Sequence, residues 1–599
     1  MCGLFGVARL GLEPQPIGTS TADRCRNALH TLTHRGPDAW GEWQDKRAYV
    51  GHRRLSIIDT SSHGVQPMVH KRSGHVLAYN GEIYNFRELR AQLAFDYDFE
   101  STTDSEVLLH GFDKWGIRGL LGRIEGMFAF AIYDPVRGKL YLARDRVGIK
   151  PLYVGFGNSE ITFASELKAI VEYSEPGSLT HDPSALYDFL TYGYVPTPKS
   201  LYKNVEKLSP AHYLEIDLEG SCRQDISYWS LDDSIGSRST GSLATELRGQ
   251  LRDSVREQMI ADVPIGFFLS GGIDSSAVTA AAAHHGARQQ TFSIGFDSVS
   301  HDETAFAEMV ADRYQTCHHR YVLSEEEAGN IVEDVIRNYD EPFADSSAVP
   351  TYCVSKLAAE NVKVALTGDG GDEVFGGYNW YRRFSRAESR KMRFPSFFQP
   401  LTRKLRIRAS HTPAPLSARI AERLEYDHLL KGFDLYARLM GGLIAREKMD
   451  YRNYWEIPED YDDYWQYRAF YRQDLPVLTR LQYLDFHTYL PDDILTKVDR
   501  AAMMVSLETR VPLLSTNLIE FGFGVSEADR YRDGRLKGLL MASQRDELPA
   551  AILNRRKKGF SIPQKDWGAS LFSSGRTFGE NTLHQIYGQF VPPKMRLPS

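Results

Sequence analysis

Long apolar runs and a clustered cysteine framework are both missing from this chain of 599 residues. A membrane-spanning helix needs about 18 or more consecutive apolar residues, and no such run occurs. The start lacks a charged segment followed by an apolar one, so we expect a cytoplasmic protein. The spacing of the five cysteines fits neither a zinc site nor a disulfide framework: Cys2, Cys25, Cys222, Cys317 and Cys353.

Excess positive charge is also absent, because the formal net charge is −7. This excludes an overall field that would attract nucleic acid or an anionic membrane. One basic run, between residues 382 and 408, could suggest nucleic acid. Few aromatic residues accompany it and acidic residues 459–463 offset it, so a solvated helical face explains it better. We expect a soluble enzyme without nucleic-acid or membrane partners.

The order of the predicted strands and helices divides the chain into two parts. Up to residue 215, short β-like runs dominate, at residues 4–10, 76–79, 128–133, 139–143, 152–156 and 161–164. One early helix places residues 25, 28, 29 and 32 on one face. Gly, Ser and Asp cluster in residues 216–242, which predicts a linker. From residue 243 to 599, strands and helices alternate, as in a parallel sheet with its ligand site at the carboxyl ends of the strands.

Cys2 directly follows the initiator methionine. Its side chain is small enough to let an aminopeptidase remove Met1, which would leave one residue with a thiol and a free α-amine. An unperturbed α-amine has a pKa of about 7.7–8, so it can activate the thiol near neutral pH. Taken alone, a cysteine here is more often an accident or a small buried residue. Later motifs favour the catalytic interpretation.

A glycine-rich turn at residues 269–276 lies where a hydrophobic strand passes into a helix. Gly271 and Gly272 let backbone amides approach an anion, serine hydroxyls can donate, and the helix N-terminus adds positive potential. No Gly-Lys-Ser/Thr follows, so this is not a Walker loop. Asp274 would repel phosphate unless a cation lay between them, which predicts bound Mg²⁺. The alternative is a turn that only caps a helix.

A second turn, at residues 367–373, follows another predicted strand and is rich in Gly and Asp. Turns after two strands of a parallel sheet can converge on one crevice. Asp372 is then a plausible second carboxylate for the metal. Together the two turns predict a site for a magnesium nucleotide.

With these motifs identified, the chain resembles the glutamine-hydrolysing asparagine synthetase family over nearly its whole length. The N-terminal half is similar to class II glutamine amidotransferases at residues 1–7, 34–38, 54–59, 79–85, 103–106 and 144–145. The C-terminal half resembles ATP pyrophosphatase-type synthetases at residues 270–276, 367–378, 490–500 and 506–512. The ordered co-occurrence of these segments in one chain is highly specific.

The resemblance implies an α+β N-terminal-nucleophile glutaminase domain with αββα layers over residues 1–215. An α/β parallel-sheet synthetase domain would follow over residues 243–599. Cys2 would attack the glutamine side-chain amide, and Asn80 with Gly81 would form the oxyanion hole. Arg54 and Asp104 would hold the glutamine α-carboxylate and α-ammonium, although without the family a surface ion pair would be the favoured interpretation of these two residues. The remaining implied glutamine-binding residues are Leu55, Ser56, Ile57, Ile58 and Glu82.

In the synthetase half, the family implies that ATP adenylates a carboxylate, which ammonia then captures. The implied ATP-binding residues are Phe268, Leu269, Ser270, Gly271, Gly272, Asp274, Ser275, Ser276, Ile294, Thr367 and Gly368. Mg²⁺ would lie on Asp274 and Asp372, and Asp369 and Lys537 would be catalytic. For Lys537 the alternative is a helix-surface lysine. The family also carries ammonia between its sites through a tunnel.

Some positions depart from the familiar asparagine-forming pattern. Asp369 replaces a glutamate, Ser515 an aspartate, Arg556 a proline and Met541 an arginine. These changes leave both reactions intact and put the acceptor in doubt. Aspartate, giving asparagine, is the first hypothesis, and a uronic acid or biosynthetic precursor is the alternative. A β-lactam-synthetase-like ligase and a noncatalytic regulatory homologue are disfavoured because both predicted sites retain their residues. A homodimer is a candidate assembly.

Overall fold

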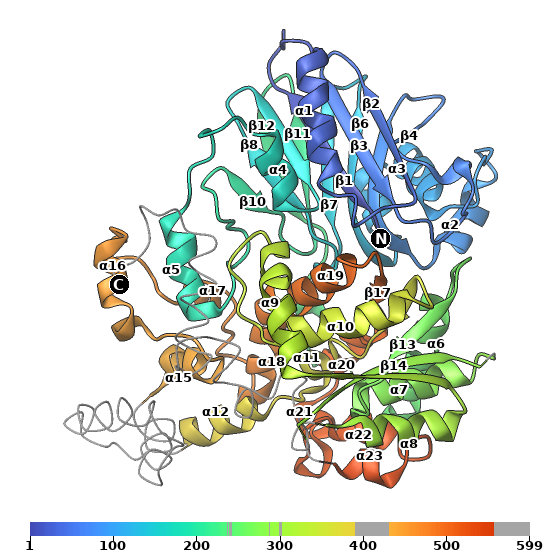
Figure 1. Ribbon diagram of the computed structural model, residues 1–599, viewed down its shortest axis with the longest axis vertical. Coiled ribbons are helices and arrows are strands. Elements are labelled where there is room, and N and C mark those ends of the chain that lie inside the picture. The colour runs from blue at the N-terminus through green and yellow to red at the C-terminus, as the bar shows by residue number, and fades with distance from the viewer. Residues whose placement is uncertain (237, 239–241, 287, 299–301, 390–429, 556–599) are drawn as a thin grey trace.

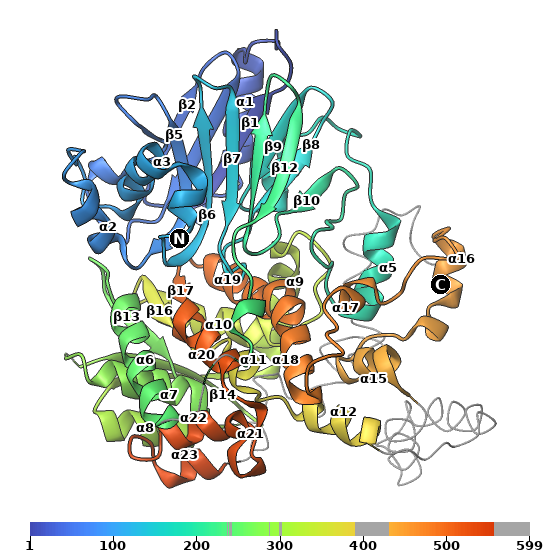
Figure 2. The ribbon, with the colours of Figure 1, turned by 180° about the vertical axis from the view of Figure 1, so that it is seen from behind.

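The computed structural model describes residues 1–555 except 237, 239–241, 287, 299–301 and 390–429. In this part of the chain, two domains lie against each other, and the N-terminus lies between them beside β17 (Glu508–Arg510) (Figures 1 and 2). No described helix is both long and apolar enough to span a bilayer. Arg556 and the chain end lie outside the described residues.

The N-terminal domain contains two antiparallel sheets of six strands each within residues 1–227, all of which are described. The first sheet has the order β10 (Val205–Lys207), β8 (Tyr153–Phe156), β9 (Glu160–Ala164), β1 (Gly3–Arg9), β3 (Ala48–Arg54) and β2 (Ala39–Gln44). The second has the order β12 (Cys222–Ser227), β11 (His212–Asp217), β7 (Lys139–Arg144), β6 (Gly126–Asp134), β5 (Val76–Ile83) and β4 (Met68–Val69).

Apolar side chains fill the space between the sheets, because alternate residues of a strand face the same side. Leu4 of β1, Ala78 of β5 and Ala131 of β6 belong to this buried cluster. Four helices cover the outer faces, α1 (Thr19–His30) and α4 (Leu167–Tyr173) on the first sheet, and α2 (Phe86–Leu93) and α3 (Asp104–Leu121) on the second. These αββα layers confirm the predicted fold of the N-terminal domain.

The early elements agree with the sequence predictions. The six predicted strands correspond to β1, β5, β6, β7, β8 and β9. The predicted helix is α1, in which Cys25, Ala28 and Leu29 are buried, while buried Leu32 lies in the turn after it. The strands β2, β3, β4, β10, β11 and β12 were missed. β4 has only two residues, and most of the others carry glycine or charged residues that hide the alternating pattern.

The segment predicted as a linker, residues 216–242, contains part of the second sheet. β12 pairs with β11 through the register Cys222 to Asp217 and Ser227 to His212. Most β12 residues are exposed, so the polar composition of an edge strand resembles that of a linker. The sheet therefore continues to Ser227, and the next domain's first helix, α6, spans Leu243–Gln258.

The C-terminal domain contains a five-stranded parallel sheet within the described residues, as predicted. Its strand order is β15 (Cys317–Leu323), β14 (Gln290–Phe296), β13 (Ile265–Phe268), β16 (Val364–Leu366) and β17. The chain builds outward from β13 in one direction and then from β16 in the other. The boundary between β13 and β16 is thus the switch point at which such sheets bind ligands.

Some helices pack on this sheet, and others lie away from it, among them one helix of the N-terminal half (Figure 1). The predicted helices are α7 (Ile273–Ala283), α8 (Thr304–Tyr314) and α10 (Ala348–Ala359). Other described helices include α5 (Pro183–Tyr192), α9 (Glu325–Asn338), α11 (Gly371–Phe375), α12 (Asn379–Ser389), α15 (Gly432–Leu439), α16 (Met449–Tyr454), α17 (Trp465–Ala469), α18 (Val477–His487), α19 (Thr496–Met503), α20 (Thr516–Gly524), α21 (Glu527–Arg530), α22 (Gly538–Ser543) and α23 (Ala550–Asn554).

Only the start of the basic run lies within the described residues, on α12. Tyr381 and Phe384 of this helix are buried, whereas Arg383 and Arg386 are exposed. This arrangement is the solvated helical face that the sequence predicted. The basic residues from 390 onward lie outside the described residues.

Candidate active sites in the two domains

Cys2 lies at the start of β1, facing β5 of the second sheet. Its backbone N–H donates to Asn80 Oδ1 at 2.8 Å, and its carbonyl accepts from Arg35 Nε at 3.0 Å. The thiol Sγ lies 3.9 Å from the carbonyl oxygen of Leu55. Burial raises the pKa of the Cys2 thiol, while the nearby chain-terminal amine opposes this shift. The fold therefore holds Cys2 firmly, and its thiol depends on a neighbouring positive charge to ionise.

Asn80 and Gly81 lie on β5 beside Cys2. The Asn80 side chain is fully buried, and its Nδ2 donor has no hydrogen-bond partner among the described residues. A Cβ on Gly81 would lie only 2.1 Å from the carbonyl oxygen of Met127, so glycine is needed for β5 to lie this close to β6. An unpaired buried amide donor next to a cysteine is suited to donate a hydrogen bond to a developing oxyanion.

A pocket lies beside Cys2, and most of the predicted glutamine-binding residues line it. Its lining includes Arg54, Leu55, Ile57, Ile58, Gly81, Glu82 and Asp104. Asn80 adjoins the pocket through Cys2, whereas the Ser56 N–H points away from it and donates to Asp38 Oδ2 at 2.8 Å. Lining residues that the sequence reasoning missed are Met1, Gly64, Gln66, Tyr79, Thr103, Ser105 and Glu508.

Arg54 holds the wall of this pocket. Its guanidinium donates to the carbonyl oxygens of Ser61, at 2.7 Å, and Ile58, at 3.2 Å, and also to that of Asp59. A Cβ on Gly64 would lie 2.0 Å from Arg54 Nη2, so glycine makes room for the guanidinium. Arg54 is thus buried among backbone carbonyls and does not pair with Asp104 in the way a surface ion pair would.

Two carboxylates face the same pocket. Asp104 Oδ2 accepts from the Tyr79 hydroxyl at 2.8 Å and from the Ile83 N–H at 2.9 Å, and burial raises the pKa of Asp104 to about 6. Burial and the nearby Asp104 also raise the pKa of Glu82. Glu82 Oε2 accepts from Arg510 at 3.0 Å, while Glu82 Oε1 has no hydrogen-bond partner among the described residues. This carboxylate pair would be stabilised by a cationic group in the pocket.

Glu508 brings the C-terminal domain into the pocket. Its Oε2 pairs with the buried Met1 amine at 3.0 Å, and its Oε1 accepts from Arg510 Nε at 2.7 Å. Burial would raise the pKa of Glu508, but these two cations lower it to about 2. The segment at residues 506–512 was recognised from the sequence, but nothing there indicated contact with a cysteine more than 500 positions away.

The two glycine-rich turns meet at the switch point of the parallel sheet. The first joins β13 to α7, where Gly271 has a φ of +68° and Gly272 is the N-cap of the helix. The second follows β16. A Cβ on Gly368 would lie 2.6 Å from the Ser275 N–H nitrogen, so the turns are in direct contact. Helix α7 directs its N-terminus at this junction, which favours an anion there.

The side chains of the predicted ATP-binding set divide into two groups. Ser270 and Ser275 hydroxyls lie 3.1 Å apart at the turn, and Thr367 Oγ1 accepts from the Asp369 N–H at 3.3 Å. Leu269, Ser276 and Ile294 are buried, and Phe268 is partly buried in the core. Phe268, Leu269 and Ile294 can offer a ligand only their backbone or an apolar side-chain edge, whereas the buried Ser276 Oγ has no hydrogen-bond partner among the described residues.

Lys537 joins the acidic residues of both turns. Its Nζ lies 2.5 Å from Asp274 Oδ2 and 2.5 Å from Asp372 Oδ1, and only 4% of the residue is exposed. Burial would lower the pKa of Lys537, but the two aspartates raise it above its usual value. This contradicts the helix-surface alternative. A Cβ on Gly371 would lie 2.4 Å from Asp274 Oδ1, so glycine leaves space beside this carboxylate.

These carboxylates suit Mg²⁺, which prefers hard oxygen ligands and is often held by one or two carboxylates plus phosphates. Within the described ranges, no group of three or more His, Cys, Asp or Glu side chains could hold a metal alone. Nucleotide oxygens would therefore complete the shell. Asp369 lies in the second turn, where burial raises its pKa and Lys497 opposes the shift.

Comparison with known proteins agrees with this geometry. An asparagine synthase family model matches residues 246–583, and a glutamine amidotransferase domain model matches residues 1–229. The chain belongs to the asparagine synthase family. It is 32% identical to glutamine-hydrolyzing asparagine synthetase 1 of Bacillus subtilis, over 95% of this chain and 88% of that protein.

Two other similar proteins are also named as asparagine synthetases. Glutamine-hydrolyzing asparagine synthetase 3 of Bacillus subtilis is 29% identical over 94% of this chain and 87% of its own length. Asparagine synthetase B of Escherichia coli is 32% identical over 65% of this chain and 66% of its own length. The solved structure of a glutamine phosphoribosylpyrophosphate amidotransferase from Bacillus subtilis covers 54% of this chain and 81% of its own, at 17% identity. The TM-score of 0.29 is low.

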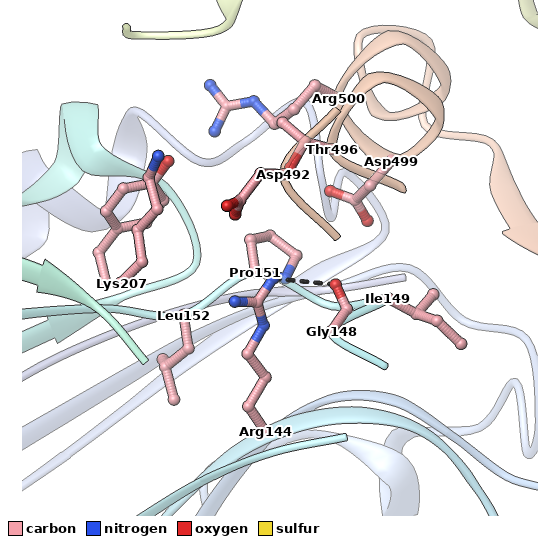
Figure 3. A pocket seen from close by; sticks show the side chains of 11 residues that line it. Arg144, Gly148, Ile149, Pro151, Leu152, Lys207, Asp492, Thr496, Asp499 and Arg500 are labelled. Carbon is pink, nitrogen blue, oxygen red and sulfur yellow. Dashed lines mark hydrogen bonds between the residues drawn. The ribbon is translucent and has the colours of Figure 1, made fainter. Parts of the chain in front are cut away.

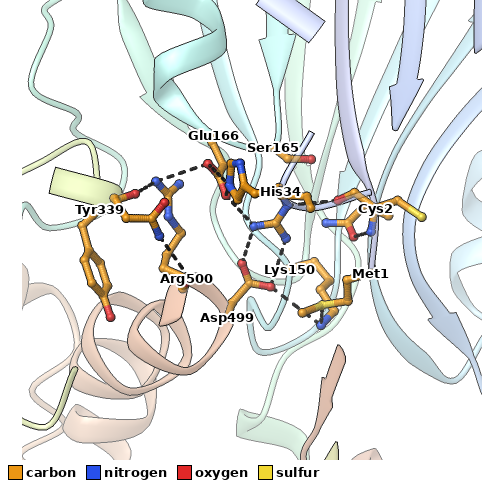
Figure 4. A network of polar contacts seen from close by, with 12 residues as sticks. Met1, Cys2, His34, Lys150, Ser165, Glu166, Tyr339, Asp499 and Arg500 are labelled. Carbon is orange, nitrogen blue, oxygen red and sulfur yellow. Dashed lines mark hydrogen bonds and ion pairs between the residues drawn. The ribbon is translucent and has the colours of Figure 1, made fainter. Parts of the chain in front are cut away.

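Buried ion pairs join the two domains of the chain. Arg35, fully buried, donates to Asp499 Oδ2 at 2.8 Å and to Glu166 Oε1 at 2.7 Å. Figure 4 shows Asp499 and Arg500 on one helix, facing Glu166 and His34 of the glutaminase domain. Since Arg35 also donates to the Cys2 carbonyl, the same guanidinium contacts both the domain interface and Cys2.

A pocket with several charged side chains in its lining lies in the same interface. Arg144 reaches into it from the glutaminase domain, and Asp492, Thr496 and Asp499 face it from the synthetase domain (Figure 3). Arg144 donates to three backbone carbonyls, those of Lys150, Leu208 and Gly148, which orient its guanidinium. Residues of both domains therefore line this pocket.

Proposed function

We propose that the protein uses glutamine and ATP to convert aspartate to asparagine, releasing glutamate, AMP and pyrophosphate. One observation supports this most strongly: a single chain carries a cysteine held by Asn80 beside a pocket and, in its other domain, two glycine-rich turns joined by Lys537. The pocket suits amide hydrolysis, and the junction of the turns suits adenylation. The matching names of the relatives agree with both halves.

In the glutaminase half, removal of Met1 would leave the Cys2 nitrogen as an α-amine that still reaches Asn80 Oδ1. This amine would accept the thiol proton, and the thiolate would attack the glutamine amide. The protonated amine would return the proton to the leaving nitrogen, so that ammonia departs and a thioester forms. Water would then hydrolyse the thioester, which releases glutamate and regenerates the thiol. Asn80 Nδ2 and the Gly81 N–H would stabilise the oxyanion. Arg54 would bind the α-carboxylate, and Asp104 with Glu82 would bind the α-ammonium.

In the synthetase half, the acceptor carboxylate would attack the α-phosphorus of ATP and displace pyrophosphate. Adenylation is needed because a free carboxylate is a poor electrophile, whereas AMP is a good leaving group. Lys537 would neutralise charge on the phosphates, and Asp274 and Asp372 would hold Mg²⁺, which screens the polyphosphate when bound. Asp369 would lie near the adenylate.

Aspartate is the proposed acceptor, and a uronic acid or biosynthetic precursor is the alternative. The alternative rests on Asp369, which is one methylene shorter than glutamate. Of the other departures, Ser515 is the N-cap of α20 and Met541 lies in α22 one turn after Lys537. A cytoplasmic location and a homodimer stay predictions.

The test is to incubate the protein with Mg²⁺, ATP, glutamine and aspartate, and to measure asparagine and pyrophosphate. The proposal predicts both products, in equal amounts. Strong glutaminase activity without asparagine would favour the other acceptor class. Pyrophosphate release should then be screened against candidate carboxylates.

A further inference from the structure

We infer that Asp262 and Lys363, two residues of the synthetase domain, are positioning residues for glutamine hydrolysis. They act through the glutamine loop, defined here as residues 55–61, which forms one wall of the Cys2 pocket. The inference rests on the proposed glutaminase function and adds to it that the glutamine site is completed by the other domain. Neither residue lies in the nucleotide turns or in the pocket lining.

The glutamine loop has little internal structure to hold it. It contains no helix or strand, and Asp59 adopts a φ of 52°, which residues with side chains rarely do. Burial would raise the pKa of Asp59, but hydrogen bonds from Ser61 and Thr102 lower it to about 2. The loop shape therefore depends on partners outside it. Arg54 supplies some of them through its carbonyl contacts.

Asp262, in the synthetase domain, makes two more hydrogen bonds to the loop. Its carboxylate Oδ2 accepts from the Asp59 N–H at 2.8 Å, and its own N–H donates to the Ile57 carbonyl at 3.0 Å. These two bonds hold the backbone on both sides of Ile58. Because Ile57 and Ile58 line the pocket, the position of Asp262 sets the position of this wall.

Lys363 holds the other end of the loop through Asp38. Its Nζ lies 2.8 Å from Asp38 Oδ2, and the same oxygen accepts from the Ser56 N–H at 2.8 Å. Ser56 directly follows Leu55, whose carbonyl faces the Cys2 thiol. The ammonium thus orients a carboxylate that in turn fixes the backbone beside the nucleophile.

The fold explains why these residues meet the loop. Asp262 lies three positions before β13, and Lys363 lies directly before β16, so both mark the amino ends of the two central strands. The nucleotide turns follow the carboxyl ends of the same strands. At the next strand, Glu508 and Arg510 reach the buried side of the glutamine pocket. The amino ends of these strands therefore lie toward the glutamine pocket, and their carboxyl ends lie at the proposed ATP site.

Loosening the loop should affect glutamine binding more than the chemical step. Asp262 and Lys363 are exposed or half-exposed, so each contact is weaker than a buried one. We expect Asp262→Ala to raise the glutamine KM about three- to tenfold. Lys363→Ala should raise it about two- to threefold. In both variants, kcat at saturating glutamine should stay within about twofold of wild type, since bound substrate reorders the loop.

The experiment compares steady-state glutaminase kinetics of the full-length variants with their ammonia-dependent synthetase rates. Asp262→Asn retains an acceptor oxygen for the Asp59 N–H and should restore most of the affinity. Asp253→Ala and Lys356→Ala are matched controls, because both residues are exposed in the same domain and contact no described part of the loop. The ammonia-dependent rate reports whether the synthetase domain is intact.

Unchanged glutamine KM in Asp262→Ala and Lys363→Ala would overturn the inference. So would equal losses in the ammonia-dependent reaction, because the effect would then be general destabilisation. A wild-type protein without glutaminase activity would instead overturn the proposed function itself. The expected result is a raised KM in the two alanine variants, recovery in Asp262→Asn, and wild-type values in both controls.

Discussion

The Asn80 side chain offers a sharp test of the glutaminase site. Asn80→Ala removes the acceptor of the Cys2 N–H bond at 2.8 Å and the unpaired Nδ2 donor together. It leaves Gly81, Arg54 and the carboxylates of the pocket in place. The change should therefore weaken stabilisation of the transition state more than binding of glutamine.

Loss of one oxyanion donor costs about 2.7–4 kcal/mol, so kcat of glutaminase should fall about 10²–10³-fold. The glutamine KM should change by less than about threefold, because the groups that bind the α-carboxylate and α-ammonium remain. The assay is glutamate release at saturating glutamine. Ammonia-driven asparagine synthesis by the same preparation is the control.

Two results would refute this reasoning. A fall in kcat of less than about threefold would mean that the Nδ2 donor does not face the developing charge. A parallel fall with ammonia as nitrogen donor would mean that Asn80 matters for the fold of the chain. Asn80→Asp provides a second check, because it keeps the acceptor for Cys2 but replaces the donor with an oxygen.

Three further predictions concern the other parts of the enzyme. Lys537→Met should lower asparagine synthesis at least about a hundredfold with either nitrogen donor, measured as pyrophosphate release, while leaving glutaminase intact. Burial raises the pKa of Asp104 to about 6, so the glutamine KM should be constant above that pH and rise as the pH falls through it, as kinetics from pH 5 to 8 would show. Arg35→Met should lower the free energy of unfolding in urea by about 3 kcal/mol, because Asp499 and Glu166 lose a buried partner.

The parts that the sequence predicted well are those set by local chemistry. A hydrophobic strand, a glycine turn and an alanine-rich helix follow one another within residues 265–283, so β13 and α7 could be placed in advance. The same holds for β16 and the turn after it. The convergence of Asp274 and Asp372 followed from the rule for parallel sheets, and the structure has both within reach of Lys537.

The parts that could not be predicted depend on contacts between distant segments. Nothing local distinguishes Glu508 as a partner of the Met1 amine, or Asp499 as a partner of Arg35. Edge strand β12 has a polar composition that is typical of a linker. The glutamine loop likewise owes its shape to Asp262, a residue in no recognised motif.

The most direct test of the central claim, two separate sites with ammonia passing from one to the other, uses Cys2→Ala with aspartate, ATP and Mg²⁺. Asparagine should be measured with glutamine and, separately, with ammonium chloride at pH 8 as nitrogen source. The account predicts that synthesis from glutamine is lost while synthesis from ammonia continues at the wild-type rate. Equal loss with both donors, or continued synthesis from glutamine, would contradict it.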